Sequence, residues 1–229
     1  MNAISIDVAE HPKLDLAAFS LKHSDASAAQ GSVMELLSLD AKVIEQTPFD
    51  THTSAARYDE VKAALRDLLR HGGYKPTGRG KPASEYLVKA VSNGKLGSIN
   101  PIVDTLNVVS LHSALPISVV DLARCNLTSG SLSIAIAPES SEYVFNVSGQ
   151  TIKLDGLLCL FDDDGPCANG VKDSQRTKTS DTTDSSLVII WGTKDLPERS
   201  AKTETWFRQL IATYGLGLVE TVTISEISR

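Results

Sequence analysis

Aromatic residues and cysteines are both scarce in this chain of 229 residues. Aromatics make up 5% of the sequence, so leucine, valine, isoleucine and alanine must fill the interior. The three cysteines (Cys125, Cys159 and Cys167) lack C-x-x-C spacing, which argues against a disulfide framework and for reduced thiols. No apolar run approaches the roughly 20 residues that span a bilayer, and charged residues interrupt the first twenty positions, where a signal peptide needs an apolar core. We therefore expect a soluble, cytoplasmic protein with no membrane partner.

The motifs of several common catalytic and cofactor sites are also missing. The five histidines show neither H-x-H nor H-E-x-x-H spacing, so a zinc site is not expected. The glycines of residues 74–82 lack the spacing of a phosphate-binding P-loop, and neither Ser110 nor Ser118 lies in a G-x-S-x-G turn. The triple aspartate at 162–164 has the ligand type of a hard cation, but a tight hairpin turn accounts for it equally well. We predict no metal and no cofactor.

The composition, with 41% apolar and 22% charged residues, is that of an ordinary globular protein with a sizeable core. Hydrophobic periodicity predicts helices and strands in turn along the chain. The expected helices cover residues 33–45, 55–71, 83–93 and 203–214, and the expected strands cover 3–8, 14–21, 131–137, 142–148, 150–155, 156–162, 187–192 and 216–224. Neither an internal repeat nor a long linker is visible. We predict a single layered α+β domain over residues 1–229, with largely antiparallel sheets in its second half packed with helices.

The stretch INPIVDTLNVVSLHSALPISVVD, residues 99–121, stands out as the centre of the chain. Its apolar residues lie on more than one side of any helix that it forms, and such a helix is buried. Asp104 and Asn107 are three residues apart and so share one face. Buried polar side chains need partners or a ligand. We therefore predict a buried helix that ends at a bend before Pro116 and forms the wall of a pocket.

The net charge of −6 is unevenly distributed. Residues 61–95 hold eight Lys or Arg against two acids and so carry +6, which leaves −12 for the remainder. Three of these cations, Lys75, Arg79 and Lys81, project from an irregular loop. Such asymmetry provides a phosphate-attracting face on an acidic protein, although two solvated helix faces account for it as well. The polar segment 173–184 is likewise either a ligand-facing segment or a solvated loop.

Three segments together resemble one family. The stretch GRGKPASEYLVKAVSNGKLGSINPIVDTLNVVSLHSALPISVVDL is similar to the central part of the B3/B4 tRNA-binding and editing module of the phenylalanyl-tRNA synthetase beta chain, especially in its stand-alone versions. The matching positions are Arg79, Ser84, Glu85, Asn100, Pro101, Val103, Asp104, Asn107, Ser110, Leu111, Pro116 and Asp121, followed by Arg176, Thr177, Lys178 and Thr182 or Thr183 in an R-T-x-x-T-x-x-T-like segment. The resemblance covers residues 57–191, with weaker likeness in the N-terminal part (1–56) and the C-terminal part (192–229). No catalytic module of a synthetase is present.

The resemblance implies a site and an activity. The synthetase module binds the 3′ end of tRNA misacylated with tyrosine and hydrolyses the ester in a cleft beside this helix. A stand-alone copy would act in trans as an aminoacyl-tRNA deacylase, with a pocket for the amino-acid moiety and polar groups that position a water molecule. The implied residues are Asn107 and Ser118 for catalysis, Asp104, Ser110, Asp121, Arg176 and Thr177 for substrate binding, and Lys75, Arg79 and Lys81 for nucleic-acid binding.

The sequence departs from the synthetase pattern at two positions. Ser118 stands where the bacterial synthetases have a histidine two residues after the proline of the bend. The glutamate that reads the tyrosine hydroxyl finds no counterpart, because Ile189 or Trp191 lies at its place. Three interpretations follow: an editing module that acts on mischarged tRNA, a non-catalytic module that binds RNA, an amino acid or another small molecule, and a protein-interaction scaffold. Neither the amino acid, the tRNA nor the oligomeric state follows from the sequence.

Overall fold

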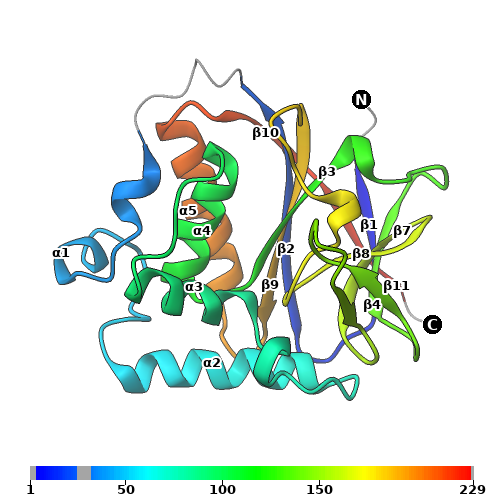
Figure 1. Ribbon diagram of the computed structural model, residues 1–229, viewed down its shortest axis with the longest axis horizontal. Coiled ribbons are helices and arrows are strands. Elements are labelled where there is room, and N and C mark those ends of the chain that lie inside the picture. Colours follow the sequence, from blue (N-terminus) through cyan, green and yellow to red (C-terminus); the bar gives the residue numbers. More distant parts are fainter. Residues whose placement is uncertain (1–3, 25–31, 228–229) are drawn as a thin grey trace.

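The computed structural model describes residues 4–24 and 32–227. Figure 1 shows the arrangement of its helices and strands. In the text, η marks a 3-10 helix. The elements are β1 (Ser5–Ala9), β2 (Leu14–His23), η2 (Val33–Leu36), α1 (Ala41–Ile44), α2 (Ala55–Arg70), η3 (Gly78–Gly80), α3 (Ala83–Ser92), α4 (Pro101–Ser113), β3 (Ile117–Asp121), η4 (Leu122–Arg124), β4 (Leu132–Ile136), β5 (Glu142–Val144), β6 (Thr151–Lys153), β7 (Leu158–Asp162), β8 (Gly165–Asn169), η5 (Gln175–Thr177), β9 (Ser185–Thr193), α5 (Arg199–Thr213), β10 (Gly217–Thr221) and β11 (Thr223–Ile227).

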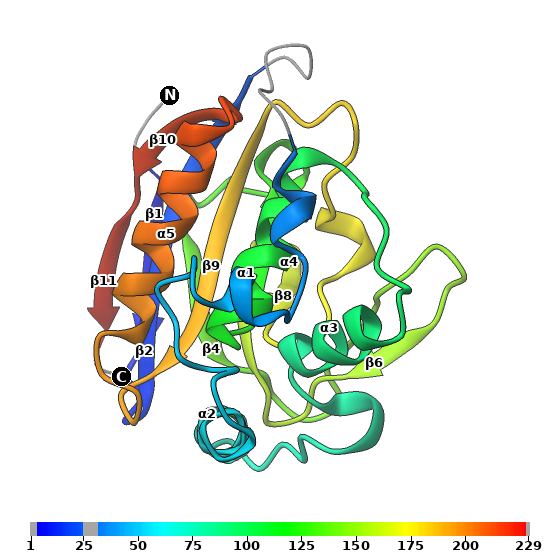
Figure 2. The same ribbon diagram turned by 90° about the vertical axis from the view of Figure 1, so that its left-hand side faces the viewer.

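Three layers make up the fold. The middle layer is an antiparallel four-stranded sheet in the order β10-β2-β9-β3. Helices α4 and α5 cover one of its faces, a five-stranded sheet in the order β11-β1-β4-β7-β8 lies on the other, and α2 crosses one end (Figures 1 and 2). Strand β1 is parallel to β11 and β4, whereas the other pairs are antiparallel. The predicted α+β class with mostly antiparallel sheets is confirmed.

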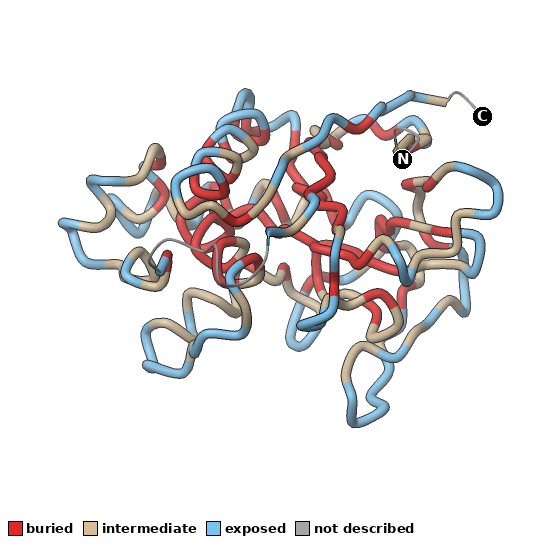
Figure 3. The backbone as a smooth tube through the Cα atoms, turned by 90° about the horizontal axis from the view of Figure 1, so that it is seen from above, coloured by how far each residue is buried: buried red, intermediate tan, exposed pale blue. Residues whose placement is uncertain are grey.

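Strand β9 is an inner strand of the middle sheet, and both of its faces are buried. Val188 and Ile190 pack into the core on the helix side. Leu187, Ile189 and Trp191 pack into the core between the two sheets. A strand covered on both faces reads as a continuous apolar run rather than as an alternation, which explains the sequence LVIIW. Figure 3 shows the buried backbone concentrated along these layers.

Helix α4 is the buried helix expected at the centre of the chain, and most of its residues are buried. The side chain of Asn100 accepts a hydrogen bond from the Val103 amide at 3.0 Å and so caps the first turn. Proline occupies the first helical position, where its missing N–H costs nothing. Ala114, with φ of 56°, ends the helix in the left-handed conformation and turns the chain into β3.

The helix expected over residues 33–45 is wrong. The chain forms the short η2 and a single helical turn, α1, with an interruption between them. The Ser38 hydroxyl donates to the Asp40 carboxylate at 2.8 Å and accepts from the Asp40 amide at 3.1 Å. Such local side-chain bonds compete with helical hydrogen bonds, and they break a hydrophobic pattern that is otherwise compatible with a helix.

Three other differences concern the ends of the chain and an unexpected strand. Helix α5 begins at Arg199, about one turn before the expected start. The final strand is split at the buried residue Val222, so that β10 joins the middle sheet and β11 the outer one. Strand β8 was not expected, and Ala3 of the first expected strand lies outside the described residues. Within the described ranges, no helix has the length and apolar character required to cross a membrane.

A substitution at Gly72, which follows α2, tests the packing of that helix against the outer sheet. A Cβ atom at this position would lie 2.3 Å from the Gly156 carbonyl oxygen and 2.6 Å from Cγ2 of Ile136. We expect Gly72→Ala to lower the free energy of unfolding by about 2 kcal/mol because of overpacking. Gly97→Ala is the matched control, since its Cβ meets no atom within 4 Å. Urea titrations showing equal stability for both variants would contradict this packing.

Candidate functional site: a basic groove above a buried polar network

A groove of about 670 Å³ lies between the loop that follows α2 and the β5–β6 hairpin. Four of the residues that line it are lysine or arginine, and none of the described lining residues is acidic. The lining comprises Tyr74, Lys75, Thr77, Arg79, Gly80, Phe145, Gly149, Gln150, Thr151, Ile152, Lys153 and Lys172. The structure therefore places two of the three residues predicted to bind nucleic acid, Lys75 and Arg79, in one groove.

The charges of the groove are not neutralised by the protein. The four cations form no ion pair with a described residue. They are Lys75 and Arg79 on one wall and Lys153 and Lys172 on the other. Burial, and next the positive charge of Arg79, lower the pKa of Lys172. Arg79 and Lys172 thus act on each other across the groove. Concentrated charge of one sign in a cleft attracts ligands of the opposite sign.

Aromatic rings accompany these cations. The ammonium nitrogen of Lys172 lies 4.1 Å from the centre of the Phe145 ring, an arrangement in which the ring quadrupole attracts the cation. Lys81, the third predicted nucleic-acid contact, lies beside the groove with its ammonium 4.6 Å from the Tyr86 ring centre. The Tyr86 hydroxyl donates to the Gly78 carbonyl at 3.1 Å, which attaches this pair to the loop. Lys81 therefore flanks the groove without lining it.

A buried polar network fixes the backbone of Lys172. The Asn169 side-chain oxygen accepts hydrogen bonds from the amides of Val171 (2.8 Å) and Lys172 (2.9 Å). The Tyr143 hydroxyl donates to the Lys172 carbonyl at 2.5 Å, and the Asn169 side-chain amide donates to the Tyr143 oxygen. Strand β8 and the β5–β6 hairpin are joined through these bonds. One wall of the groove is therefore held rigidly in position.

Ser118 lies within the same network and is fully buried. Its hydroxyl donates to the Asp173 carboxylate at 2.7 Å and accepts from the indole N–H of Trp191 at 2.9 Å. The Asp173 carboxylate also accepts from the Asn169 amide at 3.2 Å. Burial raises the pKa of Asp173 to about 6, while the bonds from Ser118 and Asn169 act in the opposite direction. The Ser118 hydroxyl is thus engaged with protein groups.

Trp191 fills the space next to Ser118. Its side chain is 1% exposed. A Cβ added to Gly170 would come within 3.4 Å of Pro116 and 3.5 Å of the indole ring, so the Gly170 backbone, Pro116 and Trp191 are closely packed. Trp191, one of the two residues at the place of the glutamate in the synthetase pattern, is therefore a buried ring that donates a hydrogen bond to Ser118. Neither Ser118 nor Trp191 is among the residues that line the basic groove.

The polar residues of α4 and the following bend lie apart from the groove. The Asp104 carboxylate accepts from the Ile99 amide (2.8 Å) and the Ser98 hydroxyl (2.5 Å), and it borders a small cavity of about 110 Å³. Ser110 donates to the Leu115 carbonyl at 2.7 Å and so stabilises the bend. Asp121 accepts from Thr183 at 2.7 Å. Asn107 is 7% exposed, and its side chain forms no hydrogen bond with the described residues.

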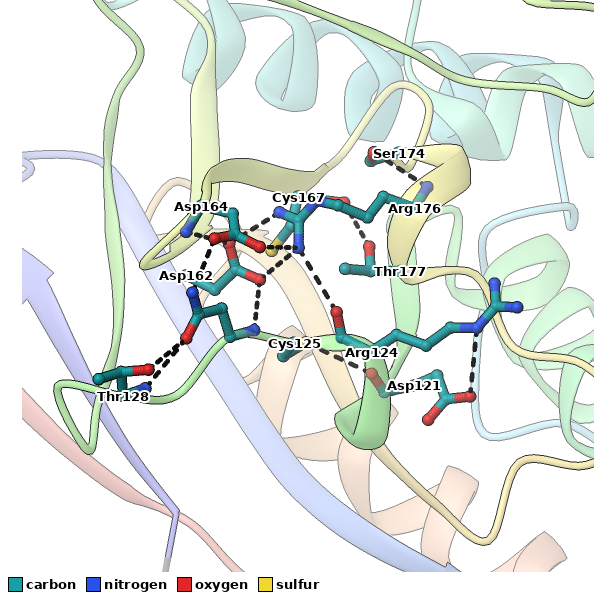
Figure 4. A network of polar contacts seen from close by, with 11 residues as sticks. Asp121, Arg124, Cys125, Thr128, Asp162, Asp164, Cys167, Ser174, Arg176 and Thr177 are labelled. Carbon is teal, nitrogen blue, oxygen red and sulfur yellow. Dashed lines mark hydrogen bonds and ion pairs between the residues drawn. The ribbon is translucent and has the colours of Figure 1, made fainter.

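Arg176 and Thr177 participate in a second network, shown in Figure 4. The guanidinium of Arg176 binds both oxygens of the Asp162 carboxylate, at 2.6 and 2.7 Å, a bidentate geometry of high specificity. The Thr177 hydroxyl donates to the Cys167 carbonyl at 2.9 Å. Asp162 also ends strand β7 at the hairpin to β8, so the interpretation of the triple aspartate as a turn agrees with the structure. Both networks attach the segment 170–178 to the outer sheet.

Sequence reasoning missed the second wall of the groove. Phe145, Lys153 and Lys172 lie far along the chain from the basic segment 61–95, and only the fold brings them together. The nearest available signal was the polar start of the segment 173–184, which follows Lys172 directly. Asn169 and Tyr143 gave no signal, because an isolated polar residue in a strand pattern is ordinary.

Asp173 provides a test of the network through pH. A carboxyl whose pKa is higher in the folded than in the unfolded state stabilises the fold when protonated, and this contribution is lost as pH rises from about 4 to above 6. The quantity of interest is the free energy of unfolding of Asp173→Asn minus that of wild type. We expect this difference to be larger at pH 7.5 than at pH 4.5, by up to about 3 kcal/mol. Urea unfolding at both pH values measures this difference. The exposed Glu139→Gln serves as control, and a pH-independent difference for Asp173→Asn would contradict the buried carboxyl.

A family model described as the B3/4 domain matches residues 75–204, which is more than half of the chain. Among solved structures, an N-terminal fragment of the phenylalanyl-tRNA synthetase beta-subunit from Pyrococcus horikoshii is similar, with a TM-score of 0.52 and 9% identity. The similarity covers 97% of this chain but 52% of that one, so the chain spans about half of the fragment. A search of curated proteins returned no match. The chain belongs to the B3/4 domain family, and its fold is similar to that of the synthetase fragment.

Proposed function

We propose that this chain is an RNA-binding module that holds the single-stranded 3′ end of tRNA in the basic groove. The observation that carries the proposal is the set of four cations without acidic neighbours in the lining of one groove. Membership of the B3/4 family, and the likeness to a fragment of a tRNA synthetase subunit, point to tRNA as the nucleic acid. Localised positive charge on a chain of net charge −6 favours a defined site over general adhesion.

The chemistry of the groove suits a single strand. Phosphates pair with lysine and arginine, and each such contact releases counterions from the nucleic acid. Bases stack on aromatic rings, and Phe145 and Tyr74 supply such rings between the cations. The rigid backbone of Lys172 keeps one cation in place before the ligand arrives, which lowers the entropic cost of binding.

Binding without hydrolysis is favoured over deacylation. Ester hydrolysis needs a pocket for the amino-acid moiety and a polar group that positions water or stabilises the oxyanion. Ser118 is fully buried and bonded to Asp173 and Trp191, and the indole ring packs into the adjacent space. Asn107 remains a candidate contact for the amino-acid end of a ligand.

The salt dependence of RNA affinity tests the groove. We expect wild type to bind a short RNA carrying the acceptor-end sequence of tRNA, with affinity falling as salt rises at a logarithmic slope of about −3 for four contacts with a single strand. Lys75→Ala and Arg79→Ala should each weaken binding and reduce the magnitude of the slope by about 0.7, because each removes one phosphate contact with a single strand. Fluorescence anisotropy over a salt series measures both quantities.

Lys89→Ala is the matched control for these variants. Lys89 is exposed on α3 and does not line the groove, so its removal changes the net charge equally without altering the proposed site. An equal loss of affinity for Lys89→Ala would show that binding depends on net charge alone. A flat salt response in wild type would remove RNA as the ligand.

A deacylation assay distinguishes binding from editing. Incubation with a panel of mischarged tRNAs should leave the ester intact at the rate seen in buffer, because Ser118 is buried and Trp191 fills the neighbouring space. The measurement is the amount of amino acid retained on each tRNA over time. Accelerated ester loss by wild type, abolished in Asn107→Ala, would establish an editing enzyme instead.

A further inference from the structure

A second cavity, of about 210 Å³, lies at the N-terminal end of α4, where strand β2 ends. In Figure 1 this end of the molecule lies at the top, whereas α2 and the loop of the basic groove lie at the bottom. Its walls include His23, Asn100, Ile102, Asp181, Thr183 and Leu216. None of these residues lines the groove, so the two sites are separate.

The interior of this cavity is largely apolar. Ile102 and Leu216 are 4% and 6% exposed and, together with Pro101, supply apolar surface. A cavity of about 150 Å³ holds one benzene molecule. The larger volume here therefore suits a molecule of about eight non-hydrogen atoms, which is smaller than the ligand of a typical binding cleft.

The electrostatics of the cavity favour a cation over an anion. Asp181 contributes a carboxylate, and no lysine or arginine is among the described lining residues. Burial lowers the pKa of His23, against the nearby charges of Asp121 and Asp184, so the imidazole is neutral at neutral pH.

The start of α4 offers few free amides to an anion. Proline at the first position of the helix has no N–H group. The Val103 amide donates to the Asn100 side chain at 3.0 Å, and the Asp104 amide donates to the Asn100 carbonyl at 2.8 Å. Two of the amides that bind anions at other helix N-termini are thus already engaged.

We propose that this cavity binds a small primary amine with a branched or aromatic apolar substituent. The ammonium group pairs with the Asp181 carboxylate at the rim, and the substituent packs on Ile102 and Leu216. Shape and charge act together, because the apolar part enters the interior only while the cationic end stays at the solvated rim. The site is independent of the RNA-binding proposal, since it shares no lining residue with the groove.

Ligand-observed NMR and calorimetry with 3-methylbutylamine test the proposal, with 3-methylbutanol and 3-methylbutanoate as neutral and anionic analogues. We expect saturable binding of the amine, weaker binding of the alcohol, and no saturable binding of the carboxylate. Asp181→Asn should weaken amine binding about fivefold, the effect of one exposed ion pair. Glu139→Gln, which removes one exposed carboxylate outside the lining, is the control and should leave affinity unchanged.

A second variant closes the mouth of the cavity. Ser180 is exposed and lines the cavity, so Ser180→Trp adds a large ring at the rim without changing the core. We expect this variant to lose amine binding while it keeps RNA affinity, which separates this site from the groove. The proposal is overturned if wild type shows no saturable amine binding. Equal affinity for amine and carboxylate, or unchanged affinity in Asp181→Asn, would overturn it as well.

Discussion

The hydrogen bonds around Asp173 are the interaction on which the site depends. Asp173 joins Ser118 on β3 to Asn169 on β8, and Ser118 in turn accepts from Trp191 on β9. These bonds connect the middle sheet to the outer sheet. Apolar packing between the two sheets does not by itself fix their relative position, whereas directional hydrogen bonds do. Asp173 is half-buried, and a carboxylate withdrawn from water is costly unless its partners are in place. The network therefore fixes the position of the segment that carries Lys172 into the groove.

The same network is the reason why we propose binding without hydrolysis for this chain. The Ser118 hydroxyl contributes to the contact between sheets, and the Trp191 ring occupies the space beside it. A group that holds two layers together cannot also move toward a substrate without weakening that contact. The electrostatic part of the site, by contrast, lies on the surface and depends only on the placement of Lys75, Arg79, Lys153 and Lys172. Binding through surface charges therefore does not require an open cavity in the interior.

Much of the fold follows from local sequence, while the site does not. Helix α2 was predictable because its apolar stripe begins after Ser54, whose hydroxyl accepts from the Arg57 amide at 3.1 Å. Helix α4 was predictable because it is apolar on several sides. Strand β8 was not, since its sequence GPCAN lacks β-branched residues, and the interruption at Ser38 depends on side-chain bonds that periodicity ignores. The basic segment indicated one wall of the groove, but pairing it with Lys172 required tertiary structure.

Isotope-edited NMR of the chain titrated with acceptor-end RNA tests the central claim most directly. The account predicts that amide signals of Lys75, Arg79, Phe145 and Lys172 shift on titration, because these residues line the two walls of one groove. The signals of His23 and Ile102, at the opposite end of the molecule, should remain in place. Shifts confined to that opposite end, or spread evenly over all exposed lysines, would contradict an RNA site in the basic groove.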